Sequence, residues 1–444
     1  NGDAKYLASS NNASFKVSKI SGYDIKVNAG EVNEGEDATI IVVLPKDATG
    51  NVTLVMNNKP YFAKVSDGMA KVVVPSVSAG THDFIVNYSG DDKYDKSTVN
   101  GTIKVNKKAA TLIVEDLVKY YKGDEKLTAK LVDGRGNPIA NADVAFNING
   151  KDYIRKTNNE GIASMNINLV AGTYNVAVKY NESSVNVTVT VKSTIVADDL
   201  VKMYQDPTRF YAKFLDSTGK ALANTQVRFN INGVFYTKTT NNDGVADLGI
   251  MLRPGTYILT AYNPANGEER GITITVKSLI VQSDLTKYYL NASRFQATIY
   301  NKDGSLAVNK EVTFNINGVF YHKTTDSNGV ASLGIALRPG EYIITTIVDG
   351  LDIGNKVTVL PTLVTKDLDM KYLDGSDFTA QTLDGQGKPL ANQNVSFNVN
   401  GVFYHKVTNE DGIASLKIRL MSGEYIITSS WNNFQTGNTI KISP

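Results

Sequence analysis

The chain contains no cysteine, and this absence excludes a whole set of chemical possibilities. None of its 444 residues can form a disulfide, ligate a metal through a thiolate or act as a cysteine nucleophile. Any extracellular stability must therefore come from another source. Histidine is also scarce, because only His82, His322 and His405 are present.

The sequence also has little net charge and no long apolar run. Lys plus Arg number 46 and Asp plus Glu number 44, which gives a formal net charge of +2. A charge this small provides no electrostatic argument for binding nucleic acid or an anionic membrane. No run approaches the roughly 18 apolar residues of a membrane span, and residues 1–15 lack the features of a signal peptide. We therefore expect a soluble chain, either a mature form or a fragment.

Repetition is what the sequence has in abundance. A phrase of the form Phe-Asn-Ile/Val-Asn-Gly recurs at spacings of 83, 85 and 83 residues. The four copies begin at Phe146, Phe229, Phe314 and Phe397. An Asp-Leu pair precedes each phrase by 30 residues, at Asp116, Asp199, Asp284 and Asp367. Four units thus share one register, with a period longer than that of solenoid repeats.

Within each unit the pattern is that of β-strands. Residues 244–252 alternate between apolar and polar or small residues, with Ala246, Leu248, Ile250 and Leu252 on one side. An Asn-Gly pair between two strand-like runs favours a two-residue type I′ turn, because both central residues need positive φ. These pairs lie at 149–150, 232–233, 317–318 and 400–401. Helical periodicity is absent, and about seven strands per unit match an immunoglobulin-like sandwich rather than a barrel or a propeller blade.

These observations predict an all-β chain, a tandem array of five immunoglobulin-like β-sandwich domains that forms an elongated rod. The divergent first unit keeps the hairpin and the Asp-Gly turn, with His82 where the others have tyrosine. Short β-rich junctions around Lys192, Lys277 and Pro361 would limit rotation, so the rod would be on the order of 180–200 Å long. The predicted ranges are an N-terminal segment 1–13 and domains 14–107, 108–192, 193–277, 278–360 and 361–444.

The residues of the repeated sequences resemble those of a known protein family. The unit that contains "RFNINGVFYTKTTNNDGVADLGIMLRPGTYILTAYN" resembles the tandem immunoglobulin-like repeats of adhesin-like cell-surface proteins of methanogenic archaea. The first unit, with "YSGDDKY" and "SAGTHDF", is similar to group-3 bacterial immunoglobulin-like domains. The resemblance implies an archaeal, extracellular protein of the cell surface, whose repeats form a stalk, an adhesive surface or both. Its partner would be a polysaccharide or a host or neighbouring cell surface.

No residue constellation predicts catalysis, a metal or a cofactor. His322 and His405 occupy a slot that holds Thr237 and Ile154 in other units, and a slot that accepts Ile is neither a ligand nor a general base. Three acidic turns lack the alternating oxygen ligands of a calcium loop, so we expect ordinary tight turns there. They lie at 133–136, 216–219 and 384–387.

Internal lysine–asparagine isopeptide bonds would be an alternative to disulfides. One candidate slot holds Lys119, Lys202, Lys287 and, in the last copy, Met370. A second slot holds Arg155, Lys238, Lys323 and Lys406. Since no lysine recurs in all four units beside a dependable acid and amide, we do not expect these cross-links.

Two further sets of residues are candidate sites. A tyrosine after a glycine at a strand start predicts a tyrosine corner, whose hydroxyl bonds the backbone, although a plain core aromatic explains it nearly as well. These tyrosines are Tyr174, Tyr257, Tyr342 and Tyr425. Asn-x-Ser/Thr sequons permit glycosylation, but chance accounts for their number. They lie at Asn12, Asn51, Asn87, Asn100, Asn181, Asn186, Asn291 and Asn394.

An outward phenylalanine that recurs in the hairpins is the candidate contact surface. In a hairpin turning at Asn232–Gly233, Asn230 faces Phe235, and both point outward if Phe229 points into the core. The same geometry pairs Asn315 with Phe320 and Asn398 with Phe403, whereas the first copy has Asp152. Unless each ring is covered by its own unit, three matching phenylalanines offer repeated weak sites for a sugar polymer or another fibre.

Three classes of function remain open at this point. The first is a non-catalytic, cell-surface adhesin-like rod, which we expect. The second is the subunit of an extracellular filament that assembles head to tail, with the segment "DAKYLAS" adding a strand to a neighbour. The third is a set of accessory domains of a carbohydrate-active surface enzyme. Fold alone does not choose among them.

Overall fold

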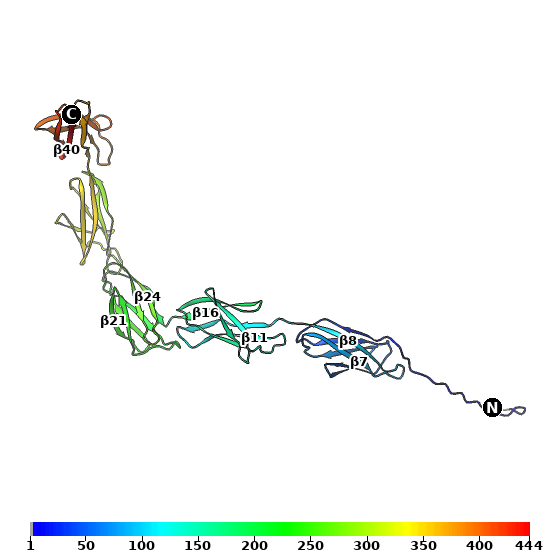
Figure 1. Cartoon of the computed structure of the whole chain (residues 1–444). Helices are drawn as coiled ribbons and strands as arrows, with labels where there is room; N and C mark the ends of the chain where they lie inside the picture. Colours follow the sequence, from blue (N-terminus) through cyan, green and yellow to red (C-terminus); the bar gives the residue numbers. More distant parts are fainter. Residues whose placement is uncertain (1–2) are drawn as a thin grey trace. The chain divides into compact units, whose positions relative to one another are not determined.

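The computed structural model describes residues 3–444, which form strands, turns and loops without a helix (Figure 1). Ten sheets, five of three strands and five of five strands, pair into five sandwiches. Each sandwich therefore has eight strands, one more than the sequence pattern indicated. The predicted all-β tandem array of immunoglobulin-like sandwiches is confirmed, while the boundaries proposed for each domain stay a prediction.

The strands have the following bounds in the first two sandwiches. The first contains β1 (Lys26–Ala29), β2 (Val32–Asn33), β3 (Ala38–Val43), β4 (Asn51–Met56), β5 (Lys59–Lys64), β6 (Met69–Val74), β7 (Gly80–Tyr88) and β8 (Ser97–Asn106). The second contains β9 (Thr111–Val114), β10 (Leu117–Tyr120), β11 (Lys126–Val132), β12 (Asp143–Ile148), β13 (Lys151–Lys156), β14 (Ile162–Asn166), β15 (Gly172–Tyr180) and β16 (Ser183–Lys192).

The other three sandwiches repeat this order. The third contains β17 (Ile195–Val196), β18 (Leu200–Met203), β19 (Arg209–Phe214), β20 (Gln226–Ile231), β21 (Val234–Thr239), β22 (Val245–Gly249), β23 (Gly255–Tyr262) and β24 (Glu269–Lys277). The fourth contains β25 (Ile280–Gln282), β26 (Leu285–Tyr288), β27 (Arg294–Ile299), β28 (Glu311–Ile316), β29 (Val319–Thr324), β30 (Val330–Gly334), β31 (Gly340–Val348) and β32 (Leu351–Leu360). The fifth contains β33 (Leu363–Thr365), β34 (Leu368–Lys371), β35 (Asp377–Thr382), β36 (Asn394–Val399), β37 (Val402–Val407), β38 (Ile413–Lys417), β39 (Gly423–Trp431) and β40 (Phe434–Ser443).

The first strand of each repeated unit is shared between the two sheets, and this accounts for the additional strand. In the third sandwich β17 joins the three-stranded sheet β17-β19-β22, and β18 joins the five-stranded sheet β18-β24-β23-β20-β21. The recurring Asp-Leu pair marks the crossing. The carboxylate of Asp199 accepts a hydrogen bond from the backbone N–H of Thr273 at 2.8 Å. Asp116, Asp284 and Asp367 make the same bond to Thr188, Lys356 and Thr439.

The Asn-Gly pairs form the predicted two-residue hairpin turns. Asn232 has φ 53° and Gly233 has φ 75°, and the flanking residues Ile231 and Val234 pair directly. Both central φ values are positive, as a type I′ turn requires. The hairpin places β21 at the edge of the five-stranded sheet, where its far side pairs with no other strand of the described chain.

Each sandwich has its own apolar core, built from the inward-facing residues of both sheets. In the third sandwich Phe229 of β20 is fully buried and meets the ring of Phe210 edge-on, with centroids 5.7 Å apart. Sandwiches four and five repeat this pair as Phe295–Phe314 and Phe378–Phe397. The first residue of the repeated phrase is therefore a core residue.

The chain divides into two compact units. The first has its main stretch up to Thr194 and adds residues 215–221 and 264–268, and the second holds the rest of residues 195–444. No helix long and apolar enough to cross a membrane occurs among residues 3–444.

The N-terminal segment forms no strand between residues 3 and 19. Its hydrogen bonds include local ones, in which the carboxylate of Asp3 accepts from the N–H groups of Lys5 and Tyr6. The side chains of Leu7 and Phe15 are 96% and 87% exposed. Within this chain "DAKYLAS" thus does not pair with a sheet edge, and pairing with another molecule stays a prediction. Residues 1 and 2 of the segment lie outside the described residues.

Candidate functional site

The recurrent phenylalanine lies on the solvent side of the five-stranded sheet, which we call the outer face. Asn230 of β20 pairs directly with Phe235 of β21, so both side chains project from the same face. Their neighbour Phe229 points the other way and is fully buried. The Phe235 side chain is 54% exposed, which is high for a ring of this size.

The fourth and fifth sandwiches present the same pair. Phe320 lies opposite Asn315 and Phe403 lies opposite Asn398. These two rings are 57% and 62% exposed, so neither is covered by its own loops.

The outer face carries a longer repeated row than the sequence analysis found. In the third sandwich four residues lie side by side across β21, β20, β23 and β24, namely Phe235, Asn230, Thr260 and Gly271. The equivalent rows are Phe320, Asn315, Thr345 and Gly354 in the fourth sandwich and Phe403, Asn398, Thr428 and Gly437 in the fifth. We call this the Phe-Asn-Thr-Gly row. Each residue of the row recurs every 83–85 residues along the sequence, but the four residues become neighbours only through strand pairing.

An isoleucine borders each of these rows on the same face, and the sequence analysis missed it. Ile258, Ile343 and Ile426 stand two residues before the row's threonine and are 60%, 62% and 64% exposed. The alternation of their strands could have revealed them. Together with this isoleucine, the row combines two exposed apolar side chains, an amide, a hydroxyl and the backbone of a glycine. This set suits contact with a chain that has both apolar and hydrogen-bonding edges.

In the third sandwich, unlike the fourth and fifth, an arginine stacks on the exposed phenylalanine. The guanidinium of Arg228 lies 4.7 Å from the ring centre of Phe235 and 5.3 Å from that of Tyr262. The two rings are 6.0 Å apart. Such cation–π contacts hold the ring in place while leaving half of it exposed.

The second sandwich has the same backbone but not the same row. Asp152 replaces the phenylalanine and accepts a 2.5 Å hydrogen bond from the Asn147 amide. Across the next strands the row continues with Ala177 and Asn186. The exposed apolar side chain of this hairpin is Ile154, one outward position further along β13. The first sandwich has Phe62, 74% exposed, at that same further position. The sequence analysis missed Phe62 and named Ile154 only as the residue that replaces the histidine in this copy.

The four candidate corner tyrosines all bond the backbone four residues upstream. The hydroxyl of Tyr257 donates to the carbonyl oxygen of Arg253 at 2.7 Å. The hydroxyls of Tyr174, Tyr342 and Tyr425 donate in the same way to Val170, Arg338 and Met421. In the first sandwich His82 takes this place, with its Nε2 atom 2.7 Å from the Ser78 carbonyl oxygen. These contacts tie a loop to a strand in each sandwich.

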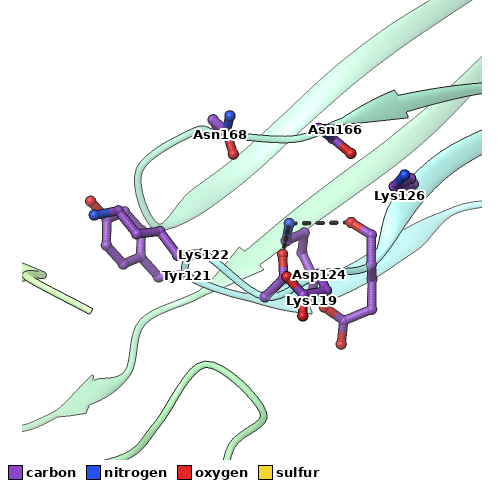
Figure 2. Close-up of a pocket in the computed structure, with 9 residues that line it drawn as sticks. Lys119, Tyr121, Lys122, Asp124, Lys126, Asn166 and Asn168 are labelled. Atoms are coloured by element: carbon purple, nitrogen blue, oxygen red, sulfur yellow. Dashed lines mark hydrogen bonds between the residues drawn. The ribbon is translucent and has the colours of Figure 1, made fainter. Parts of the chain in front are cut away.

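The three candidate lysines of the first slot are buried, and their ammonium groups bond backbone oxygens. Figure 2 shows Lys119 among the residues that line a pocket, where its Nζ atom donates to the carbonyl oxygens of Gly123 and Glu125 at 2.5 and 3.2 Å. A third bond goes to Ile167 at 3.0 Å. Asn166 and Asn168 line the same pocket, but the bonds of the ammonium go to backbone oxygens. The arrangement gives no support to an isopeptide cross-link.

Lys202 and Lys287 repeat this arrangement. Lys202 donates to Thr208 and Ile250 and Lys287 donates to Ser293 and Ile335, all through backbone oxygens. Burial lowers the pKa of both ammonium groups, because desolvation disfavours the charged form. In the fifth sandwich the apolar Met370 fills the same buried position. The residues of the second slot lie on the edge strands, where Lys238 and Lys323 are partly buried and Lys406 and Arg155 are exposed.

The acidic turns accept hydrogen bonds from their own backbone. In the turn at 216–219, the Asp216 carboxylate accepts hydrogen bonds from the hydroxyl of Thr218 and from the N–H groups of Lys220 and Thr218, and these bonds lower its pKa. Asp133 and Asp384 accept equivalent bonds in their turns. Across residues 3–444 no group of three or more His, Asp or Glu side chains is arranged to hold a metal ion. His322 and His405 stand on exposed edge strands.

Six of the eight sequon asparagines are exposed, and two are partly covered. The exposed ones are Asn12, Asn51, Asn100, Asn181, Asn186 and Asn394. The Asn87 side chain accepts a hydrogen bond from Thr98, and the Asn291 amide donates to the Gly385 carbonyl oxygen at 2.6 Å. A glycan on Asn291 would have to break this contact.

Comparison with known proteins finds similarity both in sequence and in structure. No family model matches the chain. It is 22% identical, over an alignment of 485 residues, to the inverse autotransporter adhesin YeeJ of Escherichia coli strain K12. The alignment covers 93% of this chain and 20% of that protein, so the chain spans about a fifth of the relative's length.

Two solved structures of bacterial surface proteins are among the similar folds. Invasin, a bacterial integrin-binding protein, is 13% identical and matches 89% of this chain and 100% of its own, with a TM-score of 0.28. A Ca²⁺-stabilized adhesin that helps an Antarctic bacterium bind ice is 17% identical and matches 78% of this chain and 100% of its own, with a TM-score of 0.19. At these TM-scores the likenesses carry no argument about function.

Proposed function

We propose that this chain is a non-catalytic, tandem-domain region of a cell-surface adhesin-like protein, and that it contacts its extracellular target through the outer faces of its sandwiches. The similarity to the inverse autotransporter adhesin supports the adhesin-like role and the extracellular location. The narrower assignment, to the adhesin-like proteins of methanogenic archaea, rests on the repeat wording alone and is part of the proposal.

The observation that carries the proposal is the Phe-Asn-Thr-Gly row. It recurs in three successive sandwiches with its phenylalanine more than half exposed each time. Core residues are retained because the fold needs them, whereas exposed aromatic rings cost solubility and mark contact surfaces. The second sandwich folds with Asp152 at this position, so the ring is dispensable for the architecture.

Three such rows would act together. Burial of one half-exposed phenylalanine contributes about 1–2 kcal/mol, which is too little for a useful single-site affinity. Joining several sites on one chain can raise the overall affinity by roughly 10²–10⁴ when they engage one target at once. A polymer with repeating apolar and hydroxyl groups, such as a polysaccharide, fits this mode of binding.

The other two classes of function receive no specific support. A filament built by strand addition would need the N-terminal segment to pair with a neighbour, and in this chain residues 3–19 form no strand. An enzyme accessory role would depend on a catalytic region beyond these residues.

The test is a variant in which Phe235, Phe320 and Phe403 are all replaced by serine. Beads coated with the full chain are applied to plates coated with cellulose, chitin or mannan and to plates coated with the chain itself, and retention under flow is measured. We expect the variant to lose retention by at least roughly 100-fold on whichever surface holds the original chain, with an unchanged melting temperature.

A matched control removes three exposed apolar side chains from the three-stranded sheets instead. Val196, Tyr211 and Val281 are 52%, 57% and 55% exposed, and their replacement by serine should leave retention unchanged. Equal losses in the two variants, or retention that survives the loss of all three phenylalanines, would contradict the proposal.

A further inference from the structure

Successive sandwiches of the second unit meet through a recurring contact. At the end of β26, the fourth sandwich presents Tyr288 and Tyr289 to two loop tips of the fifth. One tip is the turn at 384–387, where a Cβ added to Gly387 would lie only 2.4 Å from the Tyr288 ring. The other is the hairpin between β39 and β40, where the rings of Tyr289 and Phe434 are 5.9 Å apart. Asn291 completes the contact through its 2.6 Å hydrogen bond to Gly385.

The third and fourth sandwiches meet in the same way. Met203 stands where the next unit has Tyr288, and its Cγ atom lies 3.8 Å from a Cβ added to Gly304 of the equivalent turn. The hairpin between β31 and β32 receives a hydrogen bond from Gln205 to the carbonyl oxygen of Asp349 at 3.1 Å. Within the first unit, Tyr120 takes the corresponding position against Gly219. We call the projecting residues the plug, and the glycine turn with the hairpin the socket.

The fifth sandwich presents a plug of the same build, and no socket among residues 3–444 covers it. The backbone N–H of Tyr372 donates to the Ser443 carbonyl oxygen at 2.8 Å, as that of Tyr289 does to Leu360 at 2.9 Å. The backbone is therefore held in the same way. Yet Tyr372 is 41% exposed and Lys371 is exposed, whereas the equivalent Tyr289 and Tyr288 of the fourth sandwich are partly buried.

We propose that the plug of the fifth sandwich, Lys371, Tyr372 and Leu373, is a docking surface for the socket of a further sandwich domain of this kind joined in series. The sockets of the third, fourth and fifth sandwiches are filled by the plugs before them, and only Gly136 of the second sandwich has nothing within 4 Å of an added Cβ. Each filled socket belongs to a sandwich joined by a short junction to the one that carries the plug, so a domain joined in series is the occupant that matches the contacts seen in this chain. The inference is independent of the proposed adhesive role, since it concerns the ends of the sandwiches and not their outer faces.

The socket can receive the plug because its turn has a glycine, which lacks a side chain, at the point of contact. A side chain at Gly387 would overlap the Tyr288 ring, and at φ 81° it would also be strained. The same turn in the second sandwich separates these two effects. Gly136 has φ 85°, but nothing lies within 4 Å of an added Cβ. A substitution there measures the backbone strain alone.

The test extends the full chain by repeating residues 362–444 after Pro444, with the added copy's own equivalent of Tyr372 replaced by phenylalanine so that only the original Tyr372 can be nitrated in this peptide. This choice reproduces the junction of the fourth and fifth sandwiches, where Leu360 and Pro361 correspond to Ser443 and Pro444. Nitration by tetranitromethane, with mass spectrometry of the peptides, measures the accessibility of Tyr372. We expect Tyr372 to be nitrated in the original chain and protected several-fold in the extended chain, with Tyr211 reacting equally in both.

Two controls decide the outcome. A Gly→Ala change at the added copy's equivalent of Gly387 should restore nitration of Tyr372 while the added domain stays folded by circular dichroism. Tyr372 that reacts equally in the original and extended chains, with the added domain folded, would overturn the proposal. So would protection of Tyr372 in the original chain that rises with protein concentration alongside dimer formation, because the occupant would then be a second copy.

Discussion

The second sandwich and the three that follow it share one fold and differ on one face. All have the eight strands, the Asn-Gly hairpin and the tyrosine that bonds the backbone four residues upstream. On the outer face, however, Asp152, Ala177 and Asn186 stand where the others have phenylalanine, threonine and glycine. The comparison separates what the fold requires from what it merely permits. The core half of the repeated phrase belongs to the first class and the exposed half to the second.

The largest effect should come from the core half of the phrase. Replacing Phe229 with alanine removes a fully buried ring that packs against Phe210 and Phe214, which should cost about 3–5 kcal/mol. Phe235→Ser on the facing strand should cost less than about 1 kcal/mol, because the ring is half exposed. Hydrogen exchange of the amides in β20 and β23 of the full chain measures both.

The second sandwich supplies the control for this pair of variants. Phe146→Ala should destabilise β12 and β15 as much as Phe229→Ala destabilises β20 and β23, since both rings are fully buried. If Phe235→Ser proved as damaging as Phe229→Ala, the exposed half of the phrase would belong to the fold after all.

A smaller effect should distinguish the fourth sandwich from the fifth. Burial holds the pKa of Lys287 below that of lysine in an unfolded chain. Between these two pKa values the unfolded state binds more protons, so the stability of the fourth sandwich should rise with pH across that window and be level below it. The Lys287→Met variant should lose this rise. Urea-dependent proteolysis by proteinase K at pH 7, 9 and 10 measures it, with peptides assigned to each sandwich.

The fifth sandwich is the internal reference for this measurement, because Met370 already occupies the position. Its midpoint should not respond to the Lys287 substitution at any pH. A Lys287→Met variant that keeps the original chain's pH dependence would show that the ammonium does not titrate as its burial indicates.

The sequence predicted the fold because the fold depends on local signals. Alternating strands and the Asn-Gly turns are visible in any one unit, and Phe229 and Ile231 are buried as their spacing requires. Only the strand count was wrong. The crossing at Asp199 interrupts one strand without a glycine or a proline, and its cause is a hydrogen bond to Thr273 that is distant in sequence.

The candidate surface was predicted in part for the same reason. Asn230 and Phe235 are neighbours across a tight turn, so simple hairpin geometry relates them. Thr260 and Gly271 join the row through pairing with β23 and β24, whose register no local signal gives. The contact of Tyr288 with Gly387 was beyond sequence reasoning, because the turn glycine is accounted for by its positive φ alone.

The most direct test of the account is to give the second sandwich the row that it lacks. The variant Asp152→Phe, Ala177→Thr, Asn186→Gly would create a fourth Phe-Asn-Thr-Gly row, since Asn147 is already in place. In the bead assay described above, retention should rise stepwise in chains carrying none, one, two, three and four rows. Retention that is the same with three rows and with four, or that does not depend on their number, would contradict the claim that this face makes the contact.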